Sequence, residues 1–431
     1  MKPFSFIHAA DLHLGTPFSG ISSCDEEWRQ ILIEAPFQAF ERIISLSIEH
    51  QVDFLLLSGD IYDSARQNLR AQIRFVDGLN RLSEYCIATY IAFGNHDVGD
   101  KTGSRLRWPD LVYRFPEGEL ATYPIEKNGQ RVAEVIGLSY PQQNITENYT
   151  NLFQPSGQSP FSIGVLHANV GGQPGTDNYA PCALTDLTAS AIDYWALGHV
   201  HTATILNSTN PWVVYSGTPQ GRSPRETGIK GCYLVEVVNG QAQLKFLPTN
   251  WVLWHNLTLD ITNWERLDDL ILSVEKALTA LSEQEAGSGA RFLVVRLKLV
   301  GRGPLHRELH LVDNSQAVLE DLRSRSFLGW ERVWFDDLIL QTGLEIDKEA
   351  ESCSETITAD YLQLSTALQQ ELQGLNKGEA RLVKELQQLI EPLYKQCLRR
   401  YLELPTEQEL VHLVQEAEDL GLDLLVGEED Y

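Results

Sequence analysis

The sequence of 431 residues lacks any apolar run long enough to cross a bilayer, which takes ~20 consecutive apolar residues. It reaches Asp11 before the apolar core of a signal peptide could form, so we expect a protein that is not exported. The six cysteines lie far apart and form no CxxC pair, which argues against a zinc ribbon and against a disulfide framework. These absences predict a cytoplasmic protein with reduced thiols and no membrane segment.

Positive charge is also scarce. Lysine and arginine number 34 against 59 aspartates and glutamates, a net charge of −25, of which residues 251–431 carry −17. A chain this acidic does not bind nucleic acid or an anionic membrane through bulk electrostatics. Any polyanionic substrate must therefore be held by local basic groups or by bound metal.

The first 250 residues alternate short apolar runs with amphipathic segments. Apolar residues at helical spacing predict helices over 35–50 and 68–83. The predicted strands are 6–10, 52–58, 86–93, 131–138, 162–167, 194–197, 212–216 and 232–238. This alternation predicts a layered α/β domain over residues 1–250.

The remaining sequence is predicted to form a small α/β module and a helical tail. Residues 251–343 contain three predicted strands and two helices, and the polar, acidic residues 344–360 are typical of a linker. Residues 361–431 have helical periodicity. Leucines at helical spacing follow the tail as two apolar stripes, which fit packing within the domain and docking of a partner equally well.

Five short polar motifs each follow a predicted strand. They are Asp11-Leu12-His13, Gly59-Asp60-Ile61-Tyr62-Asp63, Gly94-Asn95-His96-Asp97, His167 after residues 162–166, and Gly198-His199-Val200-His201. Each motif alone is common as a solvated turn or a structural histidine. Together they gather oxygen and imidazole donors at strand ends, where loops converge. Such donors without thiolate suit manganese, magnesium, iron or zinc and argue against copper(I) or an iron–sulfur cluster.

The five motifs resemble those of the calcineurin-like metallophosphoesterase superfamily, and so do the sequences of residues 7–15 and 215–222. Within it they are most similar to the DNA-repair exonuclease branch, which includes SbcD-type nuclease subunits and YhaO-like exonucleases. The resemblance covers residues 4–240. It implies a four-layer α/β/β/α sandwich, with the small α/β module as a cap that helps to hold DNA.

The resemblance implies two divalent metal ions. Mn²⁺ is the preferred ion, and Mg²⁺, Fe²⁺ and Zn²⁺ are the alternatives. One ion would be held by Asp11, His13, Asp60 and His201, and the other by Asp60, Asn95, His167 and His199, with Asp60 bridging. His96 would stabilise the transition state or protonate the leaving oxygen. Asp63 is the candidate that orients His96, and Asp97 is the alternative.

The substrate is expected to be DNA, cut at phosphodiester bonds as an exonuclease or endonuclease in double-strand-break repair. Protein phosphatases of the superfamily carry arginines after the second and third motifs, whereas Ser64-Ala65 and Val98-Gly99 stand here, which favours a diester. A small-molecule or cyclic-nucleotide phosphodiesterase is the alternative. A non-catalytic scaffold role is disfavoured because all seven metal-ligand positions and His96 are present.

Basic residues beside the motifs are the predicted DNA contacts. They are Lys101, Arg105 and Arg107 after the third motif and Arg222 and Arg225 after the fifth. Lys230, Arg323, Arg325 and Arg332 are weaker candidates. So few groups predict few phosphate contacts and a shallow salt dependence. The resemblance further implies an SbcC-type coiled-coil ATPase bound through the C-terminal helices, and a homodimer.

Overall fold

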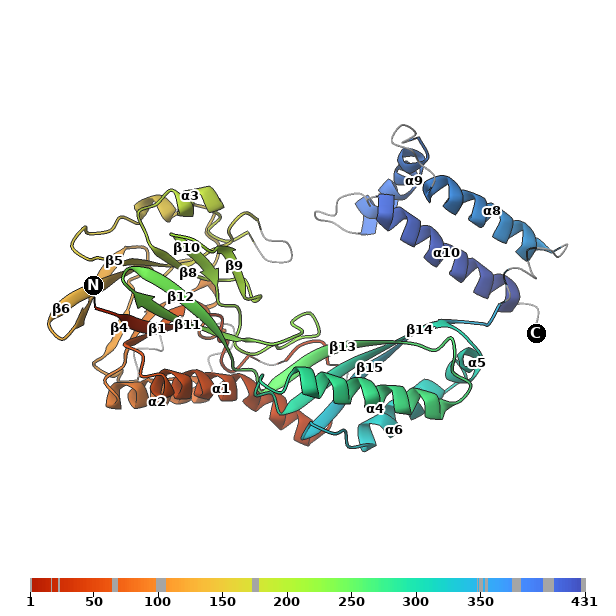
Figure 1. Cartoon of the computed structure of the whole chain (residues 1–431), viewed down its shortest axis with the longest axis horizontal. Coiled ribbons are helices and arrows are strands. Elements are labelled where there is room, and N and C mark those ends of the chain that lie inside the picture. Colours follow the sequence, from red (N-terminus) through yellow and green to blue (C-terminus); the bar gives the residue numbers. More distant parts are fainter. Residues whose placement is uncertain are drawn as a thin grey trace. The chain divides into compact units, whose positions relative to one another are not determined.

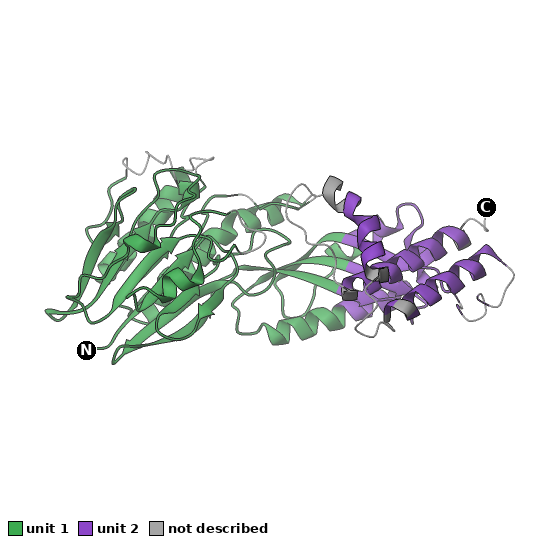
Figure 2. Cartoon of the chain, turned by 90° about the horizontal axis from the view of Figure 1, so that it is seen from above, with its two compact units in different colours: residues 1–257, 275–297, 321–337 green, residues 258–274, 298–320, 338–431 purple. Residues whose placement is uncertain are grey.

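The computed structural model describes residues 2–16, 18–21, 24–63, 69–97, 106–172, 178–346, 348, 352, 356–373, 381–397 and 407–427 (Figure 1). The chain forms two compact units (Figure 2). Unit 1 comprises Met1–Leu257, Glu275–Leu297 and Asp321–Asp337, and unit 2 comprises Thr258–Val274, Lys298–Glu320 and Leu338–Tyr431.

Unit 1 contains two six-stranded sheets. The first has the order β12-β11-β1-β2-β3-β4, in which β1 to β4 are parallel and β11 and β12 antiparallel. Its strands are β1 (Phe4–Ala9), β2 (Phe54–Ser58), β3 (Ala88–Ala92), β4 (Val112–Arg114), β11 (Gly231–Val238) and β12 (Gln241–Pro248). The second has the order β5-β6-β7-β8-β10-β9, with antiparallel strands at both edges. Its strands are β5 (Ala121–Lys127), β6 (Gln130–Gly137), β7 (Ser162–His167), β8 (Tyr194–Gly198), β9 (Thr204–Asn207) and β10 (Trp212–Tyr215).

Strand β2 shows how the layers are held together. Leu55 and Leu57 point to one face, into a core shared with helices α1 (Glu26–Glu49) and α2 (Leu69–Glu84). Phe54 and Leu56 point to the other face, into a core shared with the second sheet. Because both faces are covered, the strand reads as a continuous apolar run.

The outer face of the second sheet carries a third core. Trp195 and Leu187 belong to it, together with helix α3 (Leu184–Thr188) and the loops around it. The order of layers is therefore helix, sheet, sheet, helix, and the predicted four-layer α/β/β/α sandwich is confirmed.

Helix α1 begins well before the predicted helix start at residue 35. Asp25 caps it by accepting the backbone N–H of Trp28 at 2.7 Å. Trp28 and Leu32 contact Trp254, Phe292 and Trp334 in a separate cluster. The early part was missed because its apolar residues face this second cluster and Pro36 interrupts the pattern.

The three-stranded sheet β13-β14-β15 and the C-terminal helices complete the chain. The strands predicted in 251–343 are confirmed as β13 (Val252–Asp260), β14 (Phe292–Arg302) and β15 (Arg332–Gly343), and each continues from unit 1 into unit 2. The helices are α4 (Leu267–Gln284), α5 (Leu305–Leu309), α6 (Asn314–Ser324), α8 (Ile357–Gln373), α9 (Arg381–Cys397) and α10 (Glu407–Gly427). None of the helices in the described part of the chain has the length and apolar content needed to cross a membrane.

Candidate metal centre

The five motifs meet in unit 1 where parallel strands end. Asp11 and His13 follow β1, and Asp60 follows β2. His167 is the last residue of β7, and His199 directly follows β8. Backbone hydrogen bonds fasten the first two loops together, since Asp11 N–H donates to Gly59 O and His13 N–H to Asp60 O, both at 3.0 Å. Side chains that are distant in the sequence thereby face one another.

Two groups of donor atoms form at this point. Asp11, His13 and His201 make one group and Asp11, Asp60 and His167 the other, with the ligand atoms of each within 4.8 Å of one another. Asp11 belongs to both groups. Asp60 Oδ2, in the second group, lies 3.6 Å from His13 Nε2 of the first group and 3.4 Å from His167 Nε2 of its own group.

Asn95 and His199, the other two predicted ligands, lie beside these groups. Asn95 Oδ1 is 3.0 Å from His167 Nε2. The His199 ring lies 5.2 Å from the His167 ring, and the His199 backbone N–H donates to Asp11 Oδ1 at 3.0 Å. His199 belongs to neither three-residue donor group.

Four of these residues have left-handed backbone conformations. The φ angles are 54° at Asp11, 43° at His13, 51° at Asp60 and 97° at His199. Such angles are uncommon outside glycine, and strained residues cluster at functional sites. The surrounding hydrogen bonds therefore hold the backbone in a conformation that these residues would not adopt alone.

Two motif glycines permit the close approach of the loops. A Cβ at Gly94 would lie 2.3 Å from Asp60 Oδ1, and one at Gly198 would lie 1.8 Å from Ser58 O. Neither contact is compatible with a side chain, so the glycines are required by packing around the centre.

The charges at the centre fit bound cations. Asp11 and Asp60 are fully buried. Burial raises the pKa of Asp11. Burial also acts to raise the pKa of Asp60, but the charge and hydrogen bond of His167, together with the charges of His13 and His96, lower it below the ordinary value. Burial opposes protonation of His167, but Asp60 raises its pKa to about 9. Two buried carboxylates among imidazoles are electrostatically costly without positive charge, which divalent cations would supply.

The histidine hydrogen bonds also fit metal binding. His167 Nδ1–H donates to Ser58 O at 3.0 Å, and His201 Nδ1–H donates to Glu226 Oε1 at 2.6 Å. These bonds assign the tautomers and leave both Nε2 atoms facing the centre, where His201 Nε2 lies 3.2 Å from His13 Nε2. Two imidazole lone pairs this close are suited to a shared cation.

His96 lies at the edge of the centre with its side chain 45% exposed. Its ring is 5.1 Å from the His13 ring, and its backbone N–H donates to Asp60 Oδ1 at 3.0 Å. Asp63 Oδ1 is 3.7 Å from His96 Nδ1. His96 is thus accessible to a substrate, with a carboxylate nearby.

Asp97 has a different environment from Asp63. Its buried carboxylate accepts the backbone N–H groups of Ile61, Tyr62 and Gly94 at 2.8–3.1 Å. Burial, followed by the charge of Asp60, raises its pKa to about 7. Asp97 therefore ties two motif loops together, whereas the Asp63 carboxylate lies beside the His96 ring.

The predicted basic residues differ in their surroundings. Lys101 and Arg105 lie outside the described residues, while Arg107 and Arg225 are exposed. Burial lowers the pKa of His13, and the positive charge of the nearby Arg222 lowers it further. Lys230 is buried. The three arginines of the small module are engaged in contacts with neighbouring residues: Arg323 with Trp334, Arg325 with Asp321, and Arg332 with Glu27.

Sequence reasoning missed Glu226. This residue accepts a hydrogen bond from His201, which precedes it by 25 residues. Burial raises the pKa of Glu226, but the hydrogen bond and charge of His201 and the charge of Arg222 lower it to about 2. No spacing or motif links Glu226 to His201, so the sequence carries no signal for the pair.

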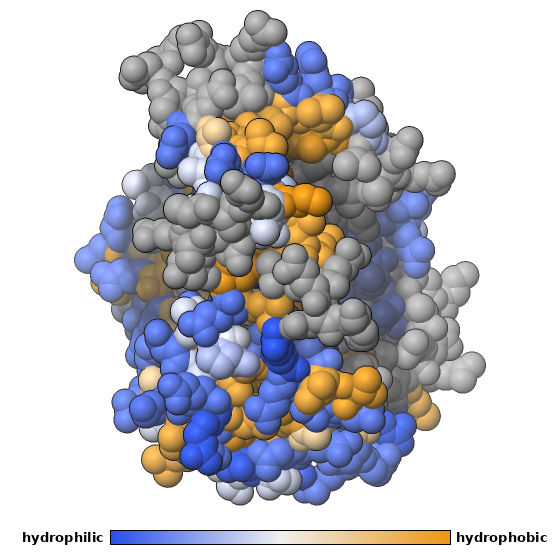
Figure 3. Space-filling model, turned by 90° about the vertical axis from the view of Figure 1, so that its right-hand side faces the viewer, coloured by the Kyte–Doolittle hydropathy of each residue, from blue (hydrophilic) through white to orange (hydrophobic). Residues whose placement is uncertain are grey.

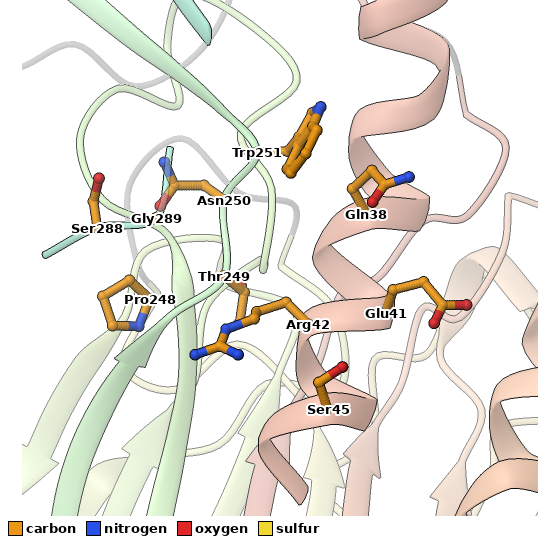
Figure 4. Close-up of a pocket in the computed structure, with 10 residues that line it drawn as sticks. All are labelled: Gln38, Glu41, Arg42, Ser45, Pro248, Thr249, Asn250, Trp251, Ser288 and Gly289. Carbon is orange, nitrogen blue, oxygen red and sulfur yellow. The ribbon is translucent and has the colours of Figure 1, made fainter. Parts of the chain in front are cut away.

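A separate cavity of about 240 Å³ lies in unit 1 (Figure 4). Gln38, Arg42 and Trp251 are among the residues that line it, and none of the predicted site residues does. The candidate centre is therefore defined by its converging donors and not by this cavity.

Comparisons with known proteins agree with the geometry. Residues 4–203 match the family model described as calcineurin-like phosphoesterase, and residues 254–343 match the model of the metallophosphoesterase YhaO middle domain. The chain is 37% identical over 304 residues to the uncharacterized metallophosphoesterase YhaO of Bacillus subtilis, covering 70% of this chain and 73% of that protein.

More distant relatives and a solved structure match in part. The DNA double-strand break repair protein Mre11 of Methanopyrus kandleri is 26% identical, over 57% of this chain and 56% of its own. A component of the nuclease SbcCD of Bacillus subtilis is 23% identical, over 54% of this chain and 66% of its own. The crystal structure of a dimetal phosphatase from Danio rerio matches with a TM-score of 0.36 and 13% identity, over 56% of this chain and 95% of that chain.

The matched family implies a dinuclear-metal phosphoester hydrolase, in agreement with the two donor groups that share Asp11. With 37% identity over most of both chains and a match to the middle domain, the chain belongs to the YhaO family of calcineurin-like metallophosphoesterases.

Proposed function

We propose that this metallophosphoesterase is a metal-dependent DNA nuclease that cuts phosphodiester bonds during double-strand-break repair. The observation that carries the proposal is the exposed His96 beside two buried donor groups. This arrangement offers a proton donor to a substrate that binds at the cations. The relatives named as a DNA double-strand break repair protein and as part of a nuclease support DNA as the substrate.

The cations are proposed to be two Mn²⁺ ions, with Mg²⁺, Fe²⁺ and Zn²⁺ as alternatives. Asp11, His13 and His201 would hold one, His167, Asn95 and His199 the other, and Asp60 would bridge. When bound, such a pair supplies Lewis-acid stabilisation of phosphate oxygens and lowers the pKa of the attacking water.

The chain's own groups complete the reaction. His96 would donate a proton to the leaving oxygen, and Asp63 would hold the His96 ring in the orientation for this transfer. Arg222 would donate hydrogen bonds to a nonbridging phosphate oxygen, because its side chain is 12% exposed and its Nε has no hydrogen-bond partner among the described residues.

Two substrates test this proposal. Purified protein with Mn²⁺ is incubated with bis-p-nitrophenyl phosphate and with end-labelled linear duplex DNA, and H96N serves as the control for contaminating nucleases. We expect wild-type protein to degrade both substrates, and EDTA to stop both reactions. Hydrolysis of the small diester alone would indicate a small-molecule or cyclic-nucleotide phosphodiesterase, and hydrolysis of neither would indicate a scaffold protein.

DNA binding is proposed to use few charges. Arg107, Arg222 and Arg225 are the described candidates, and Lys101 and Arg105 are further candidates from the sequence. With so few phosphate contacts, the logarithm of the affinity should fall only shallowly with the logarithm of salt concentration. An undetectable affinity for duplex DNA at low salt with Mn²⁺ present would contradict the proposal.

The tail is proposed to bind an SbcC-type coiled-coil ATPase, and the protein to form a homodimer. In unit 2, Tyr361 of α8 donates a hydrogen bond to Ala417 O of α10 at 2.7 Å, and Leu362 is buried. Leu364, by contrast, is 73% exposed, and apolar patches reach the surface in Figure 3. The predicted stripe on α8 is therefore divided between internal packing and a surface that a partner can cover.

The proposed domain organisation follows the sequence: nuclease domain 1–250, cap 251–343, linker 344–360 and partner-binding tail 361–431. The family-model match to residues 254–343 supports the limits of the cap. As an enzyme of DNA repair, the protein is proposed to act in the cytoplasm.

A further inference from the structure

Glu226 contacts two candidate site residues at once. Its Oε1 accepts the Nδ1–H of His201 and its Oε2 accepts the backbone N–H of Arg222, both at 2.6 Å. The side chain is only 15% exposed. A single carboxylate thus joins a candidate metal ligand to a candidate phosphate-binding arginine.

The contact with His201 sets the orientation of the imidazole. With Nδ1–H donated to Glu226, the lone pair of Nε2 faces Asp11 and His13. His13 has no equivalent support, because its buried Nδ1 has no hydrogen-bond partner among the described residues. Of the two imidazoles in this donor group, only that of His201 is therefore oriented by a carboxylate among the described residues.

The contact with Arg222 fixes the backbone of the loop that carries its guanidinium. The loop is also tied by Ser19 N–H, which donates to Arg222 O at 3.1 Å. It turns so tightly that a Cβ at Gly221 would lie 2.4 Å from Glu226 O. The guanidinium itself keeps only a 3.9 Å contact with Glu226, and its Nε is buried without an acceptor in the described structure. A buried N–H without an acceptor is costly, and a phosphate oxygen would satisfy it.

We propose that Glu226 is a positioning residue that aligns His201 for its cation and Arg222 for the substrate phosphate. Affinity for the metal and affinity for the phosphodiester then depend on the same carboxylate. The inference rests on the proposed function for the nature of the substrate, but its metal-binding half requires no substrate.

The experiment compares E226Q with E236Q, a matched change at an exposed glutamate of β11. Glutamine keeps the size of the side chain but loses the charge and presents an NH₂ group to one of the two donors. By calorimetry on metal-free protein, we expect E226Q to bind Mn²⁺ about 10- to 100-fold more weakly, and E236Q to bind it like wild type. At saturating Mn²⁺, KM for bis-p-nitrophenyl phosphate should also rise in E226Q.

A third variant, R222M, separates the two roles. It should raise KM without weakening Mn²⁺ binding. Wild-type Mn²⁺ affinity in E226Q would overturn the proposal, and a wild-type KM at saturating Mn²⁺ would overturn its Arg222 half.

The controls keep this inference separate from the nuclease proposal. If E226Q does not fold, E226D is judged by the same criterion, since its shorter side chain cannot reach both partners. Failure of wild-type protein to cut duplex DNA would contradict the nuclease proposal alone, because Mn²⁺ binding and hydrolysis of the small diester still report on Glu226.

Discussion

Asp63 places a carboxylate oxygen 3.7 Å from Nδ1 of His96, just outside hydrogen-bond distance. We therefore propose Asp63, rather than Asp97, as the residue that orients His96.

Asp63→Asn should lower kcat for bis-p-nitrophenyl phosphate about 10- to 100-fold and leave Mn²⁺ affinity unchanged. The reason is that asparagine lacks the carboxylate charge that would attract the Nδ1–H of His96 and hold the ring in place. Steady-state kinetics and calorimetry measure the two quantities, and Asp110→Asn, at an exposed position in the same unit, is the control. Wild-type kcat in D63N would remove Asp63 from the mechanism.

Gly94→Ala should lower both Mn²⁺ affinity and the free energy of unfolding, the latter by about 1–3 kcal/mol. The added methyl group would lie 2.3 Å from Asp60 Oδ1, so the loop or the carboxylate must move. Denaturant unfolding and calorimetry test this expectation. Gly287→Ala is the matched control, because a Cβ there meets nothing within 4 Å; equal effects of the two changes would contradict the packing argument.

The buried His8 should lower the free energy of unfolding at acidic pH. Burial lowers its pKa to about 3, despite an opposing backbone hydrogen bond, whereas the ordinary value is 6.5. Between these values the unfolded chain binds a proton that the folded protein does not, so the free energy of unfolding falls as pH falls. From pH 7.5 to 5.5 this group should contribute a loss of about 1.4 kcal/mol.

His8→Asn should remove that part of the pH dependence, and His50→Asn, at an exposed histidine, should keep it. Urea unfolding at pH 7.5, 6.5 and 5.5 gives the slopes. Identical slopes for H8N and H50N would show that His8 does not titrate as the buried environment predicts.

The exposed leucines of α10 predict a partner surface. Leu420 and Leu424 are each 64% exposed, so L420E and L424E together should leave thermal stability and Mn²⁺-dependent hydrolysis unchanged. Binding to an SbcC-type ATPase, measured by calorimetry, should be lost. The control L311E changes an exposed leucine of unit 2 outside the tail; retained binding in the α10 variant would contradict docking through this helix.

The sandwich was predictable wherever a strand is buried on both faces, as at β2 and β7, because such strands are apolar throughout. Edge strands were missed because their exposed faces break the apolar run. β12 is an example, although Asn239-Gly240 before it, with φ angles of 53° and 79°, is a typical hairpin turn that could have indicated it.

The candidate site was predictable in its residue types but not in its geometry. The order of the motifs at strand ends predicts that Asp11, His13, Asp60, His167 and His201 converge, and the fold brings them together. The left-handed backbone at His13 and the contact of Glu226 with His201 could not be predicted, because each depends on hydrogen bonds between loops distant in sequence.

Helix α1 belongs to two hydrophobic cores of unit 1, one through Phe40 and the other through Trp28. If α1 detached from one core, its apolar residues in the other core would also be exposed to water. Denaturation of unit 1 should therefore occur as a single transition, in which tryptophan fluorescence changes and Mn²⁺ binding is lost at the same urea concentration.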